Sequence, residues 1–270
     1  MDNLKTRFKE RREKLKNVKL RFEGMTFSRL LPNIVTLGAL CAGLSSVRWG
    51  LEGRYEGAVF FILIAAFLDG MDGRLARMFG GASRFGAELD SLADFINFGV
   101  APAVLLYLFN LKLIPTLGWG VVLLYVICSA LRLARFNVMS IEEEKNPETS
   151  AVPEGFFLGV PIPMGAFLVL LPLFLSFDQH IKVYIPSWVI CIWVVVVSLL
   201  LVSRIFTFSL KKIYIPRKYV LSVLLSIGGG IIFFLEAPWI TLFAAGVIYV
   251  FSIPFIHKKG VKKQKKETEV

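Results

Sequence analysis

The sequence predicts an all-α protein that crosses a membrane several times. Of its 270 residues, 56% are hydrophobic, whereas soluble domains average about 45–50% even with glycine counted. Apolar runs of about 20 residues, the length that an α-helix needs to cross a bilayer, recur along the whole chain. Lys and Arg gather in alternate segments between these runs. Together these features indicate a polytopic membrane protein.

We predict eight membrane-spanning helices from the apolar runs. They cover residues 30–50, 56–77, 86–110, 117–137, 155–176, 186–203, 219–235 and 238–256. Between the fourth and fifth lies a polar loop in which Pro147 and Pro153 prevent a continued helix. The Pro-Ile-Pro sequence at 161–163 is expected to break or kink the fifth helix and to shape a pocket wall.

The positive charges predict how the chain is oriented. Of its 31 Lys and Arg residues, 27 lie in residues 1–29, in the segments after the second, fourth and sixth helices, or in the last segment. The exceptions are Arg48, Arg54, Lys112 and Lys182. Because cytoplasmic segments of membrane proteins carry the excess of Lys and Arg, we expect both termini to be cytoplasmic and the number of spans to be even.

Both ends of the chain are basic. Residues 1–29 hold ten Lys or Arg among scattered Leu and Phe. This juxtamembrane segment could lie on an anionic cytoplasmic leaflet, or it could be a solvated tail that only sets topology. Residues 258–270 are expected to form a disordered basic cytoplasmic tail. Nucleic acid is not an expected partner, because the basic N-terminal segment directly adjoins a membrane span.

Four aspartates lie inside two of the predicted helices. Asp69 and Asp72 are three residues apart, and Asp90 and Asp94 are four apart, so each pair occupies one face of its helix. The short, glycine-containing loop 78–85 should pack the two helices antiparallel. We therefore expect the four carboxylates to converge in one pocket near the cytoplasmic surface.

Such a pocket suits hard divalent cations. A carboxylate near the middle of a membrane helix costs roughly 2.5–3.5 kcal/mol on insertion scales, and the spans hold too few positive residues to pair all four. Mg²⁺ combines carboxylates with substrate phosphates, and two ions can stabilise phosphoryl transfer from both sides. The absence of His and Cys argues against zinc. Arg77 suits a phosphate, and the small residues that leave room for a ligand are Gly70, Gly73, Ala76 and Gly86.

The spacing of these residues resembles a known signature. The pattern DxxDGxxAR, eight residues, then GxxxDxxxD is matched at Asp69, Asp72, Gly73, Ala76, Arg77, Gly86, Asp90 and Asp94. By it the chain is identified as a member of the CDP-alcohol phosphatidyltransferases, which transfer a phosphatidyl group from CDP-diacylglycerol or a related CDP-alcohol to a hydroxyl and release CMP. Segments 88–103, 130–138 and 155–166 resemble the integral-membrane bacterial members that use L-serine as acceptor.

The resemblance implies an architecture. The family has a six-helix catalytic transmembrane core, which here corresponds to residues 30–210. Residues 211–257 would then add two transmembrane helices, to which we assign no chemistry, between the core and the tail 258–270. The resemblance further implies a multi-pass protein of the bacterial inner membrane that forms a homodimer.

The resemblance also implies roles for individual residues. Asp69, Asp72, Asp90 and Asp94 would bind two divalent cations, Mg²⁺ or Mn²⁺, and Asp94 would also be the general base that deprotonates the acceptor. The implied contacts with CDP-diacylglycerol are Asn33, Thr36, Gly73, Arg77 and Ser83. Asn33 can also be interpreted as an ordinary polar residue near the start of a helix. Family precedent implies direct attack of the acceptor on the donor.

A serine acceptor calls for a site that binds its carboxylate. Arg132 and Arg135 end the fourth predicted helix, with Asn137 just after them, and a guanidinium can bind a carboxylate through two parallel hydrogen bonds. Alternatively, both arginines only anchor the helix at the interface. Asn97, three residues beyond Asp94, could also face the cavity.

Two other functions remain open on the sequence. Another enzyme of the same family, making phosphatidylglycerol phosphate or an inositol lipid, would need a more basic pocket for an acceptor that carries a phosphate. A divalent-cation or proton-coupled transporter would spread its carboxylates along a transmembrane path, often in pseudo-symmetric halves. Here the carboxylates cluster at one end of two adjacent helices, and the sequence shows no matching second half.

Overall fold

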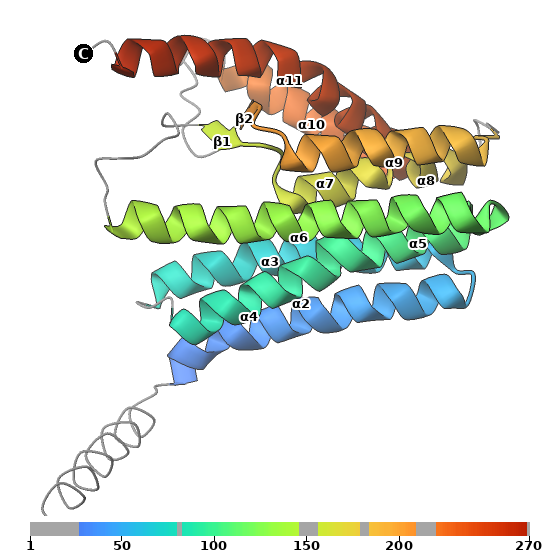
Figure 1. Cartoon of the computed structure of the whole chain (residues 1–270), viewed down its shortest axis with the longest axis horizontal. Helices are drawn as coiled ribbons and strands as arrows, with labels where there is room; N and C mark the ends of the chain where they lie inside the picture. The colour runs from blue at the N-terminus through green and yellow to red at the C-terminus, as the bar shows by residue number, and fades with distance from the viewer. Residues whose placement is uncertain (1–26, 80–82, 146–155, 179–183, 209–219, 269–270) are drawn as a thin grey trace, which may run out of the picture.

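The computed structural model describes residues 27–79, 83–145, 156–178, 184–208 and 220–268. These residues are mostly helical, as expected (Figure 1). In chain order the helices are α2 (Phe27–Leu51), α3 (Tyr55–Met78), α4 (Arg84–Asp94), the π-helix η1 (Phe95–Val100), α5 (Ala101–Phe109), the short 3₁₀ helix η2 (Leu111–Leu113), α6 (Pro115–Lys145), α7 (Ile162–Val169), α8 (Leu171–Phe177), α9 (Ser187–Val202), α10 (Val220–Glu236) and α11 (Pro238–Thr268). The basic segment 1–29 lies almost wholly outside the described residues.

Seven of the eight predicted spans coincide with a helix or with consecutive helices, and the fifth contains a short strand before its helices. Four helical stretches are long and apolar enough to cross a membrane, and they are Leu30–Leu51, Phe85–Phe109, Pro115–Glu142 and Pro238–Val261. Helices α9 and α10 are apolar but shorter. Helix α3 is not among the four because its 24 residues include the charged side chains of Glu56, Asp69 and Asp72. The structure therefore supports a polytopic helical membrane protein, while the total of eight spans stays a prediction.

Two short strands are a departure from the predicted all-α fold. Residues Phe156–Leu158 form β1, which pairs antiparallel with β2 (Phe206–Phe208), with Phe157 opposite Thr207. The fifth predicted helix was therefore placed too early, because an apolar run does not distinguish a short strand from a helix end. The sheet joins two segments that flank α7, α8 and α9 in the chain.

The Pro-Ile-Pro sequence begins a helix rather than breaking one. Pro161 immediately precedes α7 and Pro163 lies in its first turn, where a missing N–H costs little because the first N–H groups of a helix have no intrahelical acceptor. The break in the fifth predicted span lies between α7 and α8, and Pro172 occupies the first turn of α8.

Two helices extend further than predicted. Helix α6 continues to Lys145, beyond the expected end at 137, because no Pro or Gly occurs in that stretch before Pro147. Helix α11 continues to Thr268, so residues 258–268 are helical and not a disordered tail. Both helices thus project past the expected limits of the membrane spans.

The helices form two groups on either side of α6. Figure 1 shows α2, α3, α4 and α5 side by side below α6, and α7 to α11 above it. The most extensive packing joins α2 to α3 and α6 to α9. Fully buried side chains from several helices, including Leu105, Tyr125, Leu168 and Phe174, form the main core. In contrast, α10 has no buried residue, as expected for a helix that faces lipid.

Two hydrogen bonds fix the register between α6 and the α4–η1 segment. They join the Tyr125 hydroxyl to the Phe98 carbonyl oxygen at 3.0 Å and the Asn137 side-chain amide to the Ser91 hydroxyl at 3.0 Å. Because α6 runs antiparallel to α4 and η1, the middle of this stretch of α6, around Arg132, lies level with Asp94. Nearby, Phe98 packs with Ile162 and Leu133 in a small second apolar cluster.

A tight contact at the start of α6 gives a stability test. A methyl group at Gly118 would overlap the backbone carbonyl of Leu111, whereas one at Gly120 would meet no atom within 4 Å. We expect Gly118→Ala to destabilise the protein by about 1–3 kcal/mol, as other overpacked sites do. Gly120→Ala, on the same helix, should leave stability unchanged or slightly increased. Thermal unfolding of the purified proteins in detergent measures both, and equal midpoints would contradict the packing described here.

Candidate metal and nucleotide site

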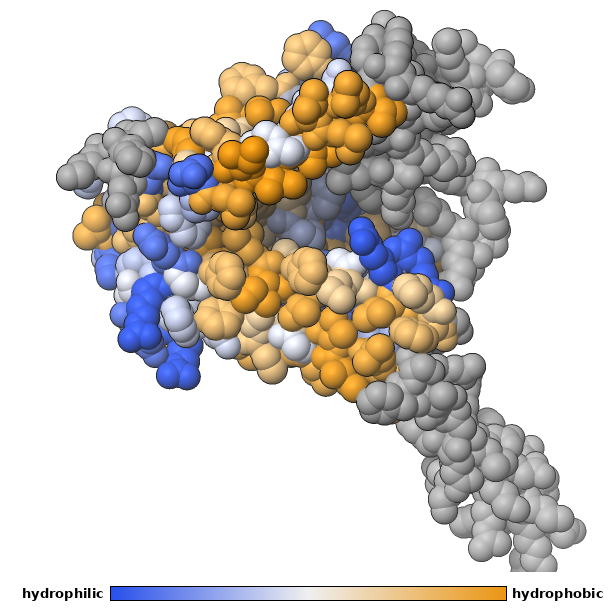
Figure 2. Space-filling view, turned by 180° about the vertical axis from the view of Figure 1, so that it is seen from behind, coloured by the Kyte–Doolittle hydropathy of each residue, from blue (hydrophilic) through white to orange (hydrophobic). Residues whose placement is uncertain are grey.

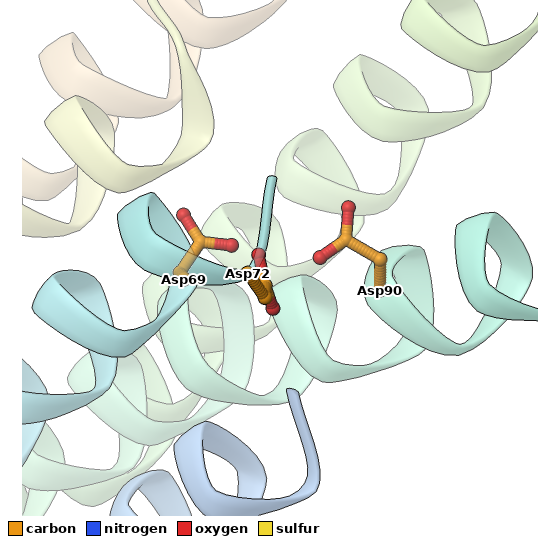
Figure 3. Close-up of side chains that lie close together, drawn as sticks. All are labelled: Asp69, Asp72 and Asp90. Atoms are coloured by element: carbon orange, nitrogen blue, oxygen red, sulfur yellow. The ribbon is translucent and has the colours of Figure 1, made fainter. Parts of the chain in front are cut away.

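Three of the four aspartates converge as their spacing predicts. One carboxylate oxygen from each of Asp69, Asp72 and Asp90 lies within 4.8 Å of the others. Figure 3 shows these side chains pointing toward one another from α3 and α4. The donors are all carboxylate oxygens, which hard cations such as Mg²⁺ and Mn²⁺ prefer, and they are close enough together to share a cation.

Asp94 adjoins this cluster. Its carboxyl group lies close enough to that of Asp69 for the two negative charges to interact strongly. Two carboxyl groups at this separation repel each other unless a proton or a cation lies between them. All four predicted aspartates therefore belong to one site, with Asp94 one helical turn deeper than Asp90.

The described part of the chain contains no protein cation paired with these carboxylates. Its ion pairs join Arg48 and Arg54 to Glu52, far from the aspartates. This arrangement speaks against the alternative in which the four aspartates simply pair with arginines. Within the described residues this negative charge is not balanced by a Lys or Arg side chain, and a bound metal cation would balance it.

A hydroxyl group orients the most buried of the aspartates. Asp72 and Thr36 are each only 5% exposed, and the Thr36 hydroxyl donates a hydrogen bond of 2.7 Å to Asp72 Oδ2. Such contacts behind a ligand carboxylate hold it in one orientation. Helix α2 therefore contributes to the cluster through Thr36, although it carries none of the carboxylates.

The first turn of α4 lies close to α2. The Ser83 hydroxyl accepts a hydrogen bond of 2.9 Å from the Gly86 N–H and so caps α4. A Cβ atom at Gly86 would lie 2.8 Å from Asn33 Oδ1 and 3.1 Å from Ser83 Oγ. Glycine at this position lets Asn33 approach the first turn of α4.

A pocket of about 200 Å³ adjoins the aspartates. Its lining residues are Pro32, Asn33, Thr36, Asp72, Gly73, Ala76, Arg77, Ser83, Gly86, Ala87 and Asp90. All five residues expected to contact the nucleotide-activated lipid are among them. Gly70, which was expected to leave room for a ligand, does not line the pocket. Ala87 lines it and was not expected from the sequence, although it lies three residues before Asp90, on the same helical face. The face of the molecule in Figure 2 is hollowed between two apolar lobes, with hydrophilic residues in its depth.

Arg77 lines this pocket, and among the described residues only its Nε has a hydrogen-bond partner. Its Nε donates a hydrogen bond of 3.0 Å to the Gly73 carbonyl oxygen on its own helix. A Cβ atom at Gly73 would meet nothing within 4 Å, so the space beside it is open. The terminal nitrogens of Arg77 are therefore placed to bind an anionic group beside the aspartates.

The two arginines of α6 differ in what they contact. Arg132 is 4% exposed, and its Nε donates a hydrogen bond of 3.0 Å to the Val160 carbonyl oxygen. Among the described residues its two terminal nitrogens have no hydrogen-bond partner. Arg135 instead donates to the carbonyl oxygens of Val202 (2.9 Å) and Ser203 (3.2 Å), at the negative end of the α9 dipole. Within the described ranges, therefore, Arg132 but not Arg135 keeps both terminal nitrogens without a partner.

The two candidate asparagines contact other parts of the protein. Asn137 is bound to Ser91 and links α6 to α4. Asn97, in the π-helix η1, is 1% exposed and does not line the pocket. Both polar atoms of its amide lack a partner among the described residues, and its side chain lies against Gly43 of α2, where any Cβ atom would overlap it. No spacing or motif in the sequence predicts this contact with Gly43.

The chain is similar to known lipid-modifying enzymes. Residues 29–252 match the model of the CDP-alcohol phosphatidyltransferase family. A protein of Mycobacterium leprae named CDP-diacylglycerol–serine O-phosphatidyltransferase is 41% identical over 86% of this chain and 76% of its own length. Proteins with the same name from Helicobacter pylori (33% identity over 73% of this chain and 79% of that protein) and Bacillus subtilis (40% over 52% and 74%) are also similar.

The hydrogen bond from Thr36 to Asp72 predicts an effect on cation binding. In Thr36→Val the carboxylate loses the donor that orients it, and we expect Mn²⁺ affinity to fall by about 10-fold or more. Thr36→Ser keeps a hydroxyl and should bind Mn²⁺ nearly as the unaltered protein does. Electron paramagnetic resonance of free Mn²⁺ during a titration measures both affinities. Equal affinity in the Val and Ser variants would show that Thr36 does not support the metal site.

Proposed function

Because the chain belongs to the CDP-alcohol phosphatidyltransferase family, we propose that it transfers the phosphatidyl group of CDP-diacylglycerol to the hydroxyl of L-serine and releases CMP. The observation that carries the proposal is the convergence of Asp69, Asp72 and Asp90 beside a pocket lined by Asn33 and Arg77. The names of the relatives support serine as the acceptor.

The pocket beside the aspartates would hold the CDP part of the donor. Arg77 offers guanidinium donors to phosphate oxygens, and Gly73 leaves open space for close approach to the backbone. Asn33, Thr36 and Ser83 line the same pocket with polar side chains. The hollow between apolar lobes in Figure 2 has the character required by a lipid, whose acyl chains need an apolar boundary and whose diphosphate needs a polar floor.

The aspartates would hold two divalent cations, Mg²⁺ or Mn²⁺. Asp69, Asp72 and Asp90 would be ligands, and Asp94 would serve the second ion. When bound, such ions neutralise the diphosphate and stabilise CMP as leaving group. Thr36 keeps the Asp72 carboxylate oriented for this role.

Asp94 would be the general base. It lies beside the cluster, one turn deeper than Asp90, where an acceptor hydroxyl can approach the phosphorus of the donor from the side of α6. The proton of the serine hydroxyl passes to Asp94 while the serine oxygen bonds to the β-phosphorus, which carries diacylglycerol. The bond from that phosphorus to CMP breaks in the same direct displacement.

Arg132 would bind the acceptor carboxylate. It is level with Asp94, and its two terminal nitrogens form the fork that a carboxylate can occupy through parallel hydrogen bonds. Arg135, Asn137 and Asn97, the other residues expected at this site, would support its walls, since their contacts tie α6 to α9, α6 to α4 and η1 to α2.

The enzyme would be a homodimeric, multi-pass protein of the bacterial inner membrane. Six helices of the core and the pair α10–α11 would make eight spans, with both termini in the cytoplasm. The distribution of 27 of the 31 Lys and Arg residues on one side supports this orientation. In this orientation the pocket would lie just below the cytoplasmic surface, where CMP can leave.

The alternative functions have less support. An acceptor that carries a phosphate would need a more basic acceptor site than Arg132 alone provides. A cation or proton transporter would spread its acidic residues along a path, whereas these four lie together where α3 and α4 meet.

An acceptor assay tests the proposed reaction. With CDP-diacylglycerol and Mg²⁺ or Mn²⁺, we expect L-serine to support CMP release and formation of phosphatidylserine, and glycerol 3-phosphate and inositol to give neither. Chelation of the metal should abolish the reaction. Thin-layer chromatography of radiolabelled lipid products identifies the acceptor, and product from glycerol 3-phosphate but not serine would rule out the proposal.

The role of Asp94 predicts a separation of binding from turnover. We expect Asp94→Asn to bind CDP-diacylglycerol with nearly unchanged affinity and to lose turnover by about 100-fold or more, because loss of a general base costs about 10²–10⁴-fold. Asp94→Glu, which keeps a carboxylate in a shifted position, should retain more activity than the Asn variant. Full activity in Asp94→Asn would refute the assignment of the base.

A further inference from the structure

The turn between β1 and α7 lies beside both arginines of α6. Gly159 in this turn has a φ of 78°, a left-handed conformation that favours glycine. A Cβ atom there would lie 2.9 Å from Arg135 Nη2 and 2.8 Å from the Ser203 carbonyl oxygen, so the turn is closely packed. The next residue, Val160, accepts the hydrogen bond of 3.0 Å from Arg132 Nε. The position of this turn therefore determines where the Arg132 guanidinium is held.

Strand β2 and the residue before it hold both polar groups of Gly159. The Gly159 N–H donates a hydrogen bond of 2.8 Å to the Ile205 carbonyl oxygen. The Gly159 carbonyl oxygen accepts a hydrogen bond of 2.8 Å from the Thr207 hydroxyl. Thr207 is 1% exposed, so loss of its hydroxyl would leave a buried carbonyl oxygen without this donor. One side chain, that of Thr207, therefore fixes the turn next to the residue that binds Arg132.

Helix α11, to which the sequence assigned no chemistry, packs on β2. The Phe206 N–H donates a hydrogen bond of 3.2 Å to His257 Nδ1, and the two rings stack with centroids 6.0 Å apart. A Cβ atom at Gly260 would lie 2.7 Å from Phe206 Cβ, so the backbone of α11 approaches the strand closely. Figure 1 shows α11 passing above β1 and β2. Helix α11 therefore restrains β2, and β2 restrains the turn.

The Arg132 guanidinium depends on this turn for its orientation. Among the residues that the structure describes, the Val160 carbonyl oxygen is its one hydrogen-bond acceptor, and its Cζ lies over the Phe136 ring at 5.9 Å from the centroid. These two contacts leave the terminal nitrogens for a ligand. A guanidinium held in one orientation loses less freedom when it binds a carboxylate than a loosely held one does.

We propose that Thr207 is a positioning residue for acceptor binding: its hydroxyl fixes the Gly159–Val160 turn, and the turn holds the Arg132 guanidinium in the orientation that takes the acceptor's carboxylate. The inference rests on the proposed function. It also gives the two-stranded sheet a purpose, since the sheet brings Thr207 to a turn about 50 residues earlier in the chain.

The test compares two Thr→Val variants of the full-length enzyme. Thr207→Val removes the hydroxyl and keeps the shape of the side chain. Thr241→Val is the matched control, because the Thr241 hydroxyl also donates to a backbone carbonyl oxygen, that of Ala237 at 2.7 Å, near the start of α11. We expect Thr207→Val to raise the KM for L-serine by about fivefold to tenfold, the loss of roughly one hydrogen bond. Its kcat and its KM for CDP-diacylglycerol should stay within about twofold, as should all constants of Thr241→Val.

Two further variants of Thr207 separate the hydroxyl from the methyl group. Thr207→Ser keeps the donor, and its KM for serine should stay within about twofold of that of the unaltered protein. Thr207→Cys replaces the hydroxyl with a weaker donor, and its KM should lie between those of the Ser and Val variants. If Thr207→Val does not fold, the comparison of Ser with Cys still decides. Equal KM values in these two variants, or a rise in the Ser variant as large as in the Val variant, would overturn the role of the hydroxyl.

Further outcomes separate the inference from the proposed function. If the unaltered protein forms phosphatidylserine and Thr207→Val leaves the KM for serine unchanged, the inference is wrong and the proposed function stands. An equal rise in the KM values of both substrates, or a loss of thermal stability without a change in KM, would also overturn it, since both indicate a purely structural role. If the unaltered protein forms no serine-dependent product, the proposed function fails and the inference fails with it.

Discussion

Mutual repulsion among four carboxylates, confined where two apolar helices meet, is the constraint on which the structure of the site depends. Carboxylate oxygens of Asp69, Asp72 and Asp90 lie within 4.8 Å of one another, and Asp94 is close enough to Asp69 to repel it. The ion pairs found in the described residues are remote from them. A bound divalent cation would balance this charge, and the phosphates of a substrate can share such a cation. The cluster therefore suits the chemistry of a family that acts on CDP-activated lipids.

Helices α2 and α6, which carry none of these aspartates, contribute other side chains to the surroundings of the cluster. Helix α2 orients Asp72 through Thr36 and places Asn33 against the first turn of α4, an approach that Gly86 permits. Helix α6 is tied to the α4–η1 segment by the bonds of Tyr125 to Phe98 and of Asn137 to Ser91, which put Arg132 at the level of Asp94. The pocket beside the aspartates is thus shaped by α2, α3 and α4, whereas Arg132 is held by α6.

Local sequence patterns did not predict the features that depend on contacts between distant segments or on very short elements. The apolar segment Phe156–Leu158 was assigned to a helix because three residues are too few for a periodicity to distinguish strand from helix, and its strand form depends on pairing with residues about 50 positions later. The Pro-Ile-Pro sequence correctly marked a helix boundary but was interpreted as a break, since proline is equally suited to a first turn. The bonds of Arg135 to carbonyl oxygens 67 and 68 positions away could not be anticipated.

The helical class and the pairing of the aspartates followed from the sequence, because three- and four-residue spacings on a helix are local geometry that needs no knowledge of the rest of the fold. The residues expected around the pocket came instead from the resemblance of the motif to a known family. The different contacts of Arg132 and Arg135 and the burial of Asn97 against Gly43 emerged only in the folded chain. Each of these depends on how distant helices meet. Two arginines three residues apart on one helix cannot be distinguished by sequence, because the carbonyl oxygens that they contact come from other parts of the chain.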